Sequence, residues 1–470
     1  MNRFILIFIL ASCLIPAPLL AKPVVFSGKS PEYAGQELIL CAYQNYITLT
    51  ESELGRTVPG KDGSFTLTID LANTRLVFFH LGKTMAYLYA QPGMRYSIVL
   101  PPRRDLDQGD LLNPYFREDE IMLGIADADT NSLNAVIARF DDAYGPIYAN
   151  YAMDFYDRNN YKQVDSTISV LTKQFEVYSN PYFRHYLYYK TGMLRNTAWQ
   201  FKARTISTPY FSGNPVCPTD PVYMELFLRV FDSYFQYFDR TRKKSEINDI
   251  ILHEKSYRKL DNLLRQDSTL INDSLRCLVI LKNIHDEFYG MTYPRSALLT
   301  ILDSLISSSP IPDMQHTGKL IREKVVRLLP GFEPPAFELL NKDGKKVKLS
   351  DLRGKYIYMG FCNCFSYSCM KEYEMLNRLQ EKHADRLTIL TISVDPSLKK
   401  MQDFLTQNGY AWTFLHYGDQ ISILREYDIR AFPTYFVIGP DGKLLLSPAP
   451  GPGENIESYL FQLMRSRGDL

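Results

Sequence analysis

The stretch Phe361-Cys-Asn-Cys-Phe-Ser-Tyr-Ser-Cys-Met-Lys-Glu372 contains three of the chain's seven cysteines and decides the fold of the region around it. The apolar run Tyr356–Phe361 predicts a buried strand, and the residues after the last cysteine predict a helix to about His383. A cysteine at a helix start has a stabilised thiolate, because the helix dipole and the free N–H groups favour negative charge. We therefore expect a reactive site at this junction, within an α/β sheet that contains parallel strands.

Ser366 occupies the place where a Cys-x-x-Cys pair at a helix start would have its exposed, nucleophilic sulfur. A serine hydroxyl stays protonated near neutral pH and forms no disulfide, so thiol–disulfide exchange cannot run through this position. Exchange would instead need a displaced pair, in which Cys364 or Cys362 forms a bridge to Cys369. Such a bridge requires Cα atoms within about 7 Å of each other, which sequence spacing alone does not settle.

The composition bounds the size and class of the protein. With 470 residues, 46% of them hydrophobic, the chain is long enough for roughly two to four globular domains. A net charge of +1 and the lack of a long basic run argue against nucleic acid as a partner. Seven cysteines are too few for a disulfide framework in a chain of this length, so the cysteine cluster needs a chemical explanation.

The first 21 residues predict a signal peptide. Arg3 precedes the apolar run Phe4–Leu10, and small residues allow cleavage after Ala21. The alternative is a lipoprotein box at residues 10–13, which would make Cys13 a lipid anchor. No later stretch approaches the roughly 20 apolar residues of a membrane-spanning helix. We expect an exported protein of a bacterial periplasm or cell envelope, in contact with the membrane only through a lipid anchor at Cys13.

The rest of the chain divides into three predicted domains. Alternating apolar residues separated by turns predict an N-terminal antiparallel β-sandwich over 22–105. Helical spacing predicts a mainly α-helical domain over 106–328, and a Pro-rich stretch introduces the α/β domain over 329–470. One predicted helix carries an aromatic stripe that we assign to the hydrophobic core, and its members are Phe227, Phe231, Tyr234, Phe235 and Phe238.

Several landmarks in residues 329–470 resemble the TlpA/ResA-like branch of the thioredoxin superfamily, with its redoxin or AhpC/TSA-like domain. They are Leu349-Ser-Asp-Leu-Arg-Gly-Lys355, Cys369-Met-Lys-Glu372, Ser393-Val-Asp395, Tyr427-Asp-Ile-Arg-Ala-Phe-Pro-Thr434 and Phe436-Val-Ile438. The resemblance implies a thioredoxin-like fold and a thiol–disulfide oxidoreductase of the cell envelope, acting in redox homeostasis on protein thiols or disulfides without a cofactor. The upstream regions resemble a Bacteroidetes-type arrangement, in which a β-rich and a helical domain precede the redoxin domain.

The resemblance also implies roles for particular residues. Pro433 would be a cis-proline beside the active-site sulfurs, where the backbone pairs with a bound substrate, and Phe432 would line the same groove. Glu372 matches the family's acidic residue near the sulfurs, which can act in proton transfer. The predicted catalytic residues are therefore Cys369, Cys364, Glu372 and Ser366.

Three other interpretations of the cysteine cluster stay open at this point. One is a redox-inactive thioredoxin fold that serves as a binding module. A second is a peroxiredoxin-like peroxidase, since Ser366-x-x-Cys369-x-x-Glu372 resembles the pattern of a hydroxyl residue three places before a reactive cysteine. The third is a Cu(I) or Zn site, because three soft ligands stand close together at Cys362, Cys364 and Cys369.

Overall fold

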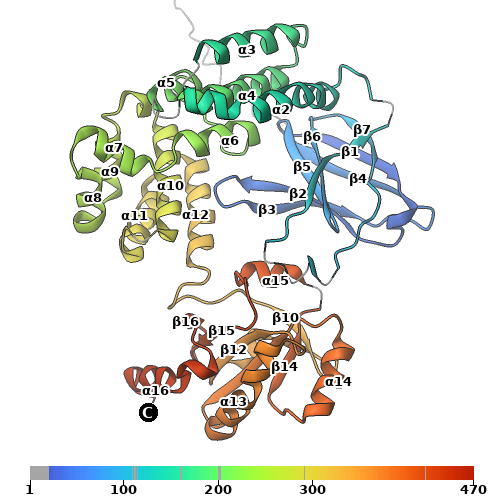
Figure 1. The fold of residues 1–470 in the computed structure, drawn as a ribbon, viewed down its shortest axis with the longest axis vertical. Coiled ribbons are helices and arrows are strands. Elements are labelled where there is room, and N and C mark those ends of the chain that lie inside the picture. Colours follow the sequence, from blue (N-terminus) through green and yellow to red (C-terminus); the bar gives the residue numbers. More distant parts are fainter. Residues whose placement is uncertain are drawn as a thin grey trace, which may run out of the picture.

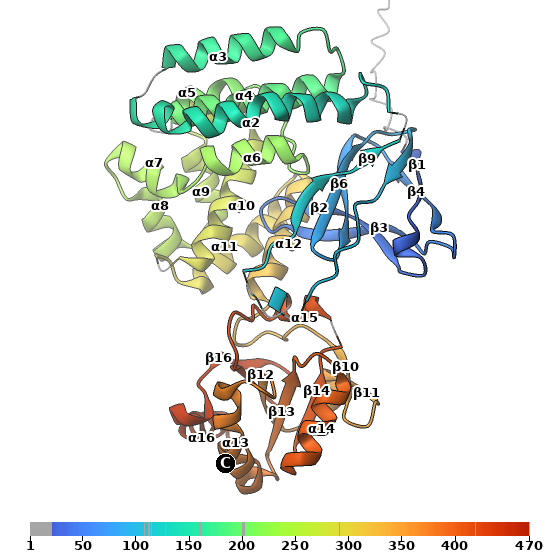
Figure 2. The same ribbon diagram turned by 45° about the vertical axis from the view of Figure 1, so that its right-hand side comes forward.

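The computed structural model of the protein describes residues 21–107, 109–110, 113, 115–126, 128–158, 161–199, 203–290, 292–418 and 420–469. Figures 1 and 2 show a β-rich part beside an array of helices, with an α/β part below both. The predicted signal peptide, including Cys13, lies outside the described residues except for Ala21. Within the part of the chain that is described, no helix is both long and apolar enough to cross a membrane.

Two sheets form the β-rich part. One sheet has the strand order β4-β1-β7-β9 and the other β3-β2-β5-β6-β8; most neighbours are antiparallel, whereas β1 and β7, and β6 and β8, are parallel pairs. Because β8 and β9 belong to these sheets, the sandwich extends beyond residue 105 to Ile125. The strands are β1 (Lys22–Lys29), β2 (Leu38–Asn45), β3 (Thr50–Thr57), β4 (Ser64–Leu71), β5 (Arg75–Leu81), β6 (Thr84–Ala90), β7 (Arg95–Val99), β8 (Asp119–Met122) and β9 (Gly124–Ile125).

Alternation in β4 shows why this region forms a sandwich. Its side chains are alternately exposed and buried along Ser64–Leu71, as period-2 patterning requires of a strand with one face in a core. The buried members pack between the two sheets with residues of β1, β2, β5 and β6. The predicted sandwich is confirmed, with the inward residues Phe65, Leu67, Ile69 and Leu71.

Helices make up the middle region, as predicted. They are α2 (Leu133–Arg158), α3 (Tyr161–Gln174), α4 (Pro181–Trp199), α5 (Ala203–Ser207), α6 (Pro221–Val230), α7 (Tyr234–Arg242), α8 (Glu246–Asp249), α9 (Tyr257–Leu264), α10 (Asp273–Tyr289), α11 (Arg295–Ser308) and α12 (Pro312–Val326). Their core includes Ile47 and Tyr89 of the sandwich. Asn134 of α2 also pairs with the backbone of Tyr89, accepting from its N–H at 2.8 Å and donating to its carbonyl at 3.0 Å. The sandwich and the helices therefore share one packed interior.

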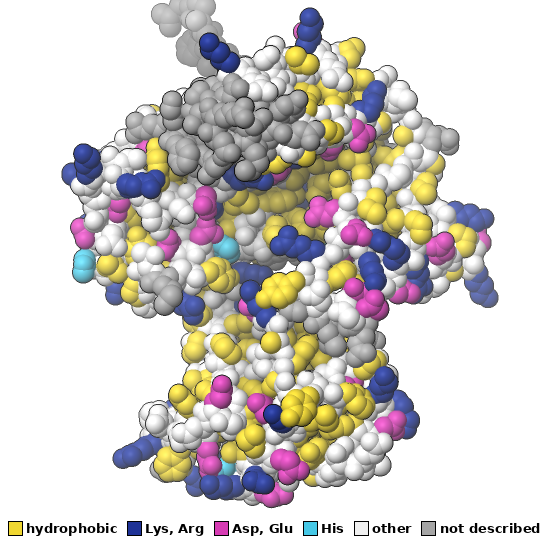
Figure 3. All heavy atoms as spheres, in the orientation of Figure 1, with side chains coloured by type: hydrophobic (Ala, Val, Ile, Leu, Met, Phe, Trp, Pro, Cys, Tyr) yellow, Lys and Arg dark blue, Asp and Glu magenta, His cyan; other side chains and the backbone are white. Residues whose placement is uncertain are grey.

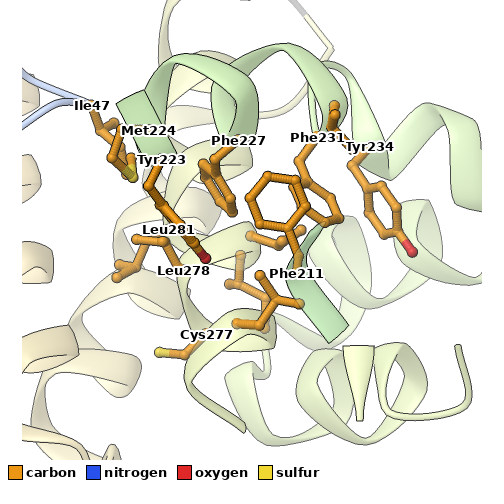
Figure 4. Close-up of a cluster of buried hydrophobic side chains, with 14 of the residues drawn as sticks. Ile47, Phe211, Tyr223, Met224, Phe227, Phe231, Tyr234, Cys277, Leu278 and Leu281 are labelled. Atoms are coloured by element: carbon orange, nitrogen blue, oxygen red, sulfur yellow. The ribbon is translucent and has the colours of Figure 1, made fainter. Parts of the chain in front are cut away.

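The aromatic stripe predicted as one helix spans two helices, so the prediction of a single helix was wrong. Phe227 lies in α6, Phe231 directly follows that helix, and the other three residues lie in α7. Ser233 lies between the two helices with φ of +49°, in the left-handed region, and interrupts the helical backbone. Asn283 of α10 then accepts hydrogen bonds from the N–H groups of Tyr234 at 2.8 Å and Phe235 at 3.4 Å, which starts α7. The assignment of the stripe to the core is confirmed: all five rings are buried, and Figure 4 shows several of them in contact.

The C-terminal part is a seven-stranded mixed sheet with the order β11-β10-β14-β13-β12-β15-β16. Strands β12, β13 and β14 are parallel, and the hairpin β15-β16 begins with a strand antiparallel to β12. This is the thioredoxin-like fold that the resemblance implies. The elements are β10 (Glu338–Asn341), β11 (Lys346–Lys348), β12 (Tyr356–Cys362), α13 (Tyr367–His383), β13 (Leu387–Ser393), α14 (Leu398–Asn408), β14 (Thr413–His416), α15 (Ile421–Glu426), β15 (Thr434–Ile438), β16 (Leu444–Ala449) and α16 (Ile456–Arg467).

Helices cover both faces of this sheet. Side chains of α13, α14 and α16 pack on one face, and those of α15 pack on the other. Every residue of β12 is buried, as expected of a central strand with helices on both sides. The last residue of the strand is Cys362, and α13 begins five residues later at the same end of the sheet.

His80 of β5 lies between two carboxylates of the β-rich part. Its Nδ1 is 2.7 Å from Glu118 Oε2, and its Nε2 is 3.0 Å from Glu51 Oε2. Burial disfavours the charged imidazolium, but the hydrogen bonds to Glu118 and Glu51 outweigh that effect and raise the pKa of His80 to about 9. The ring is therefore a charged bridge at neutral pH.

The raised pKa of His80 predicts a loss of stability in alkali. A folded-state pKa above the ordinary value stabilises the fold at low pH, and this stabilisation disappears as the pH rises through about 9. We expect a loss on the order of 1 to 2 kcal/mol, discounted because the side chain is 27% exposed. Thermal unfolding of wild type and His80→Gln at pH 7 and pH 10 measures it. The variant should show the smaller pH effect, and equal effects would contradict the prediction.

Candidate active site

The predicted site residues lie where β12 ends and α13 begins. Ser366 is the residue before the helix, with an extended backbone (φ −74°, ψ 126°), and it is half-buried. The three sulfurs are all buried: Cys362, Cys364 and Cys369 have no exposed surface. A half-buried hydroxyl thus stands where the ordinary site has its nucleophile, and the sulfurs lie beneath it.

The thiol of Cys369 lies beside the thiol of Cys362. A hydrogen bond from Cys362 is the main cause that lowers the pKa of Cys369; burial opposes it, while the backbone N–H of Asn363 and the hydroxyl of Ser366 add to the stabilisation. Burial, followed by the bond to Cys369, raises the pKa of Cys362 well above its usual range. Contact with Cys362 therefore favours the charged form of Cys369, whereas burial favours the neutral form of Cys362.

Cys364 faces a different group. Its backbone N–H donates to Asp395 Oδ1 at 3.1 Å, and the hydroxyl of Tyr373 lies 4.0 Å from its sulfur. Burial and then the Asp395 carboxylate raise the pKa of Cys364, so its sulfur keeps its proton. Of the two partners for Cys369 that the sequence left open, the structure places Cys362 against it.

Asp395 anchors the loop that carries Cys364. Ser393 donates its hydroxyl to the Asp395 carboxylate, and Nε2 of His416 lies 2.8 Å from the Asp395 carbonyl. The other ring nitrogen of His416 accepts from the N–H of Gly418 at 3.1 Å, so this histidine is engaged away from the sulfurs. Among the described residues, no group of three or more His, Cys, Asp or Glu side chains could hold a metal ion.

Tyr435, which the sequence analysis missed, lies between Glu372 and Cys362. Its hydroxyl donates to Glu372 Oε2 at 2.6 Å and is 4.0 Å from the sulfur of Cys362. Burial raises the pKa of Glu372, and the hydrogen bond from Tyr435 opposes that rise. A signal for Tyr435 existed in Gly360, its partner in the β12–β15 pairing, because a glycine in a fully buried strand leaves room for a large ring.

The proline loop reaches the same edge of the sheet. The peptide bond between Phe432 and Pro433 is cis. The next residue, Thr434, pairs with Phe361, so the loop lies at the end of β12 that carries the cysteines. Phe432 is half-buried and packs against the cluster that includes all three cysteines. The position agrees with a substrate groove, and the binding role of Phe432 and Pro433 stays a prediction.

Apolar side chains surround Ser366 on the outside. Phe365 is 58% exposed, Tyr367 69% and Met370 43%. Figure 3 shows that hydrophobic side chains are common on the visible surface of the C-terminal part. The site therefore combines an apolar rim with buried sulfurs beneath it.

The part of the chain that contains this site is similar to known proteins. Residues 330–446 match the model of the AhpC/TSA family. A thiol-disulfide oxidoreductase ResA from a strain of Bacillus cereus is 30% identical over 136 residues, which cover 28% of this chain and 78% of that protein. ResA from Bacillus subtilis (strain 168) is 29% identical over 116 residues, and the match covers 24% of this chain and 64% of that protein.

Solved structures are also similar to this part of the chain. A putative thiol:disulfide interchange protein DsbE from Chlorobium tepidum is 27% identical and covers 29% of this chain and 97% of its own, with a TM-score of 0.27. The thioredoxin domain of a thiol-disulfide oxidoreductase from Bacteroides vulgatus is 22% identical and covers 29% of this chain and 98% of its own, also with a TM-score of 0.27.

The hydrogen bonds to Cys369 predict an order of effects on its pKa. Cys362→Ala should raise the pKa of Cys369 most, because it removes the largest stabilising contact, and Ser366→Ala should raise it less. Cys364→Ala should leave it unchanged, since the Cys364 thiol faces Asp395. Titration of ¹³Cβ-labelled cysteine by NMR measures the pKa in each variant. A rise in Cys364→Ala as large as in Cys362→Ala would refute this view of the pair.

Proposed function

Because this chain belongs to the AhpC/TSA family of thioredoxin-fold proteins, alongside the ResA thiol-disulfide oxidoreductases, we propose that it is a thiol–disulfide oxidoreductase whose redox pair is Cys362 and Cys369. The observation that carries the proposal is that Cys362, at the end of β12, and Cys369, in the first turn of α13, are buried in one packed cluster, where contact with Cys362 lowers the pKa of Cys369. It supplies what exchange requires: one thiol with a lowered pKa and a second sulfur beside it.

The reaction balances over these two sulfurs. The Cys369 thiolate attacks one sulfur of a disulfide substrate, forms a mixed disulfide and releases the first substrate thiolate. Cys362 then loses its proton and attacks the sulfur of Cys369, which breaks the mixed disulfide and releases the second substrate thiolate. Two electrons pass from the protein to the substrate, and the protein is left with a Cys362–Cys369 disulfide. With a dithiol substrate the same steps run in reverse.

The other site residues would have supporting roles. The Ser366 hydroxyl donates to the Cys369 thiolate and takes over part of the stabilisation that a helix start supplies. Cys364, held by Asp395, keeps the loop in place and does not exchange. Phe432 and Pro433 would hold the substrate backbone next to the sulfurs. Because Cys369 is fully buried, a protein substrate reaches its sulfur only after the residues packed around it rearrange.

The place of action belongs to the same proposal. We infer that residues 1–21 direct export to the periplasm or cell envelope, with Cys13 as a lipid anchor if the lipoprotein box is used. Protein thiols or disulfides of that compartment are the substrates, and residues 22–105 and 106–328 precede the redox domain at 329–470. Fractionation of cells that express the full chain tests the location.

A second candidate function is a redox-inactive binding module. It is favoured by the burial of all three sulfurs together with the hydroxyl of Ser366 at the nucleophile position. In that case the apolar rim of Phe365, Tyr367 and Met370 would hold a partner chain without any exchange. The two candidates differ in one measurable property, the presence of a redox-sensitive sulfur pair.

Oxidation with diamide, followed by alkylation in denaturant and peptide mass mapping, identifies the pair. We expect a Cys362–Cys369 disulfide in the wild type and in Cys364→Ser, and none in Cys362→Ser or Cys369→Ser. Insulin reduction should be lost in the last two variants. Ser366→Cys is the matched gain-of-function control, since it restores an ordinary Cys-x-x-Cys pair. If oxidation yields no disulfide among the three cysteines, the binding module is the correct alternative.

A further inference from the structure

Side chains from three elements meet at the hydroxyl of Tyr435. Tyr435 extends from β15, Glu372 from the second turn of α13, and Cys362 from the end of β12. The hydroxyl is 2.6 Å from Glu372 Oε2 and 4.0 Å from the sulfur of Cys362. The tyrosine oxygen therefore lies within reach of both groups and connects the carboxylate to the thiol.

The ring of Tyr435 is held in one orientation. It stacks on Tyr358 of β12 with ring centroids 4.9 Å apart and an interplanar angle of 18°. Its other neighbour is Gly360, where an added Cβ would lie 2.5 Å from a ring carbon. Tyr435 is 3% exposed. The hydroxyl therefore stays directed at Glu372 and Cys362 and does not turn toward solvent.

Cys362 needs a proton acceptor that is not water. Its side chain has no exposed surface, and burial raises its pKa far above the usual range. While Cys369 is a thiolate, it accepts the hydrogen bond from Cys362. Once Cys369 is tied up in a mixed disulfide, that acceptor is gone, and the polar neighbour that stays beside the Cys362 thiol is the hydroxyl of Tyr435.

Glu372 is suited to receive that proton. The groups that act on it are Tyr435 of β15 and Glu454 in the turn before α16, and Glu372 in turn acts on Tyr358 and the two thiols. None of these groups is a cation, so they supply no positive charge that would hold Glu372 in its ionised form. A half-buried carboxylate in such surroundings takes up a proton readily.

We propose that Tyr435 passes the proton of Cys362 to Glu372 when Cys362 attacks the mixed disulfide on Cys369. The inference rests on the proposed function. Cys362 gives its proton to the Tyr435 oxygen as the Tyr435 hydroxyl proton moves to Glu372 Oε2. The Cys362 thiolate then forms the bond to Cys369, and the bond from Cys369 to the substrate sulfur breaks. Glu372 is left protonated and returns its proton to the released thiolate or to solvent.

The two attacks can be timed separately with the chromogenic disulfide 5,5′-dithiobis(2-nitrobenzoate). The reduced full chain, with Cys13→Ser and Cys217→Ser to remove other reactive thiols, should release one nitrothiobenzoate when Cys369 attacks and a second when Cys362 attacks. Tyr435→Phe keeps the ring and removes the hydroxyl. We expect its first phase to stay within about twofold of wild type and its second phase to slow by about 10²-fold, the usual size of a lost acid–base step.

The pH profile separates a proton carrier from a packing effect. The second-phase rate of the wild type should rise with pH as Glu372 ionises, because only the carboxylate accepts a proton. Glu372→Gln and Tyr435→Phe should both lose this rise. Tyr356→Phe is the matched control: it removes a tyrosine hydroxyl at the other end of β12, bonded to Asp469, and both phases should match wild type. Near-UV circular dichroism confirms that each variant is folded.

The outcomes are distinguishable. A wild type that releases no second nitrothiobenzoate overturns the proposed function and the inference with it. A wild type with two phases, and a Tyr435→Phe second phase that equals it in rate and pH profile, overturns the inference alone. A slowed second phase that keeps the wild-type pH profile shows that Tyr435 acts only by packing, which also overturns it.

Discussion

The packing of the buried thiols of Cys362 and Cys369 in one cluster is the constraint on which the proposed chemistry of this chain depends. It favours negative charge at the inner position of the helix start, because contact with Cys362 lowers the pKa of Cys369 while burial raises the pKa of Cys362. In an ordinary Cys-x-x-Cys site the outer sulfur has that role, because it is nearest to solvent and to the free N–H groups of the helix. Here Ser366 occupies the outer position, and its hydroxyl helps to lower the pKa of the inner sulfur, Cys369. Both sulfurs of the pair are therefore buried.

This buried pair depends on the packing of β12. The strand is buried along its whole length, and it places Cys362 under α13 and next to the hydroxyl of Tyr435. Gly360 leaves space for the tyrosine ring, and Tyr358 stacks on that ring. The thiols, the tyrosine and Glu372 thus lie in one sheltered cluster, where low exposure strengthens each hydrogen bond and makes an unpaired group costly.

Much of the fold was predictable because the local patterns and the tertiary packing agree. The alternation in β4 is strict, and the predicted strand Tyr356–Phe361 forms β12, which ends one residue later at Cys362. The break between α6 and α7 was not predictable, because the aromatic stripe continues through it. Asn283, which lies 49 positions after Tyr234 in the chain, supplies the hydrogen bonds that start α7. Strands β8 and β9 were missed for a similar reason, since they are short and gain their stability by pairing with β6 and β7.

The sequence by itself determined that Ser366 cannot exchange, and its resemblance to the TlpA/ResA-like branch implied a thioredoxin-like α/β domain over 329–470 with a cis-proline loop. These features are local, set by residue chemistry and by motifs that lie close together in the chain. Only the tertiary structure decided which sulfur meets Cys369 and which group meets that sulfur. Cys362 and Cys364 stand two positions apart, and their separation depends on Asp395, which binds the backbone of Cys364 from the end of the neighbouring strand. The place of Tyr435 beside Cys362 was likewise decided by tertiary structure, because the pairing of β12 with β15 brings together residues that are far apart in the chain.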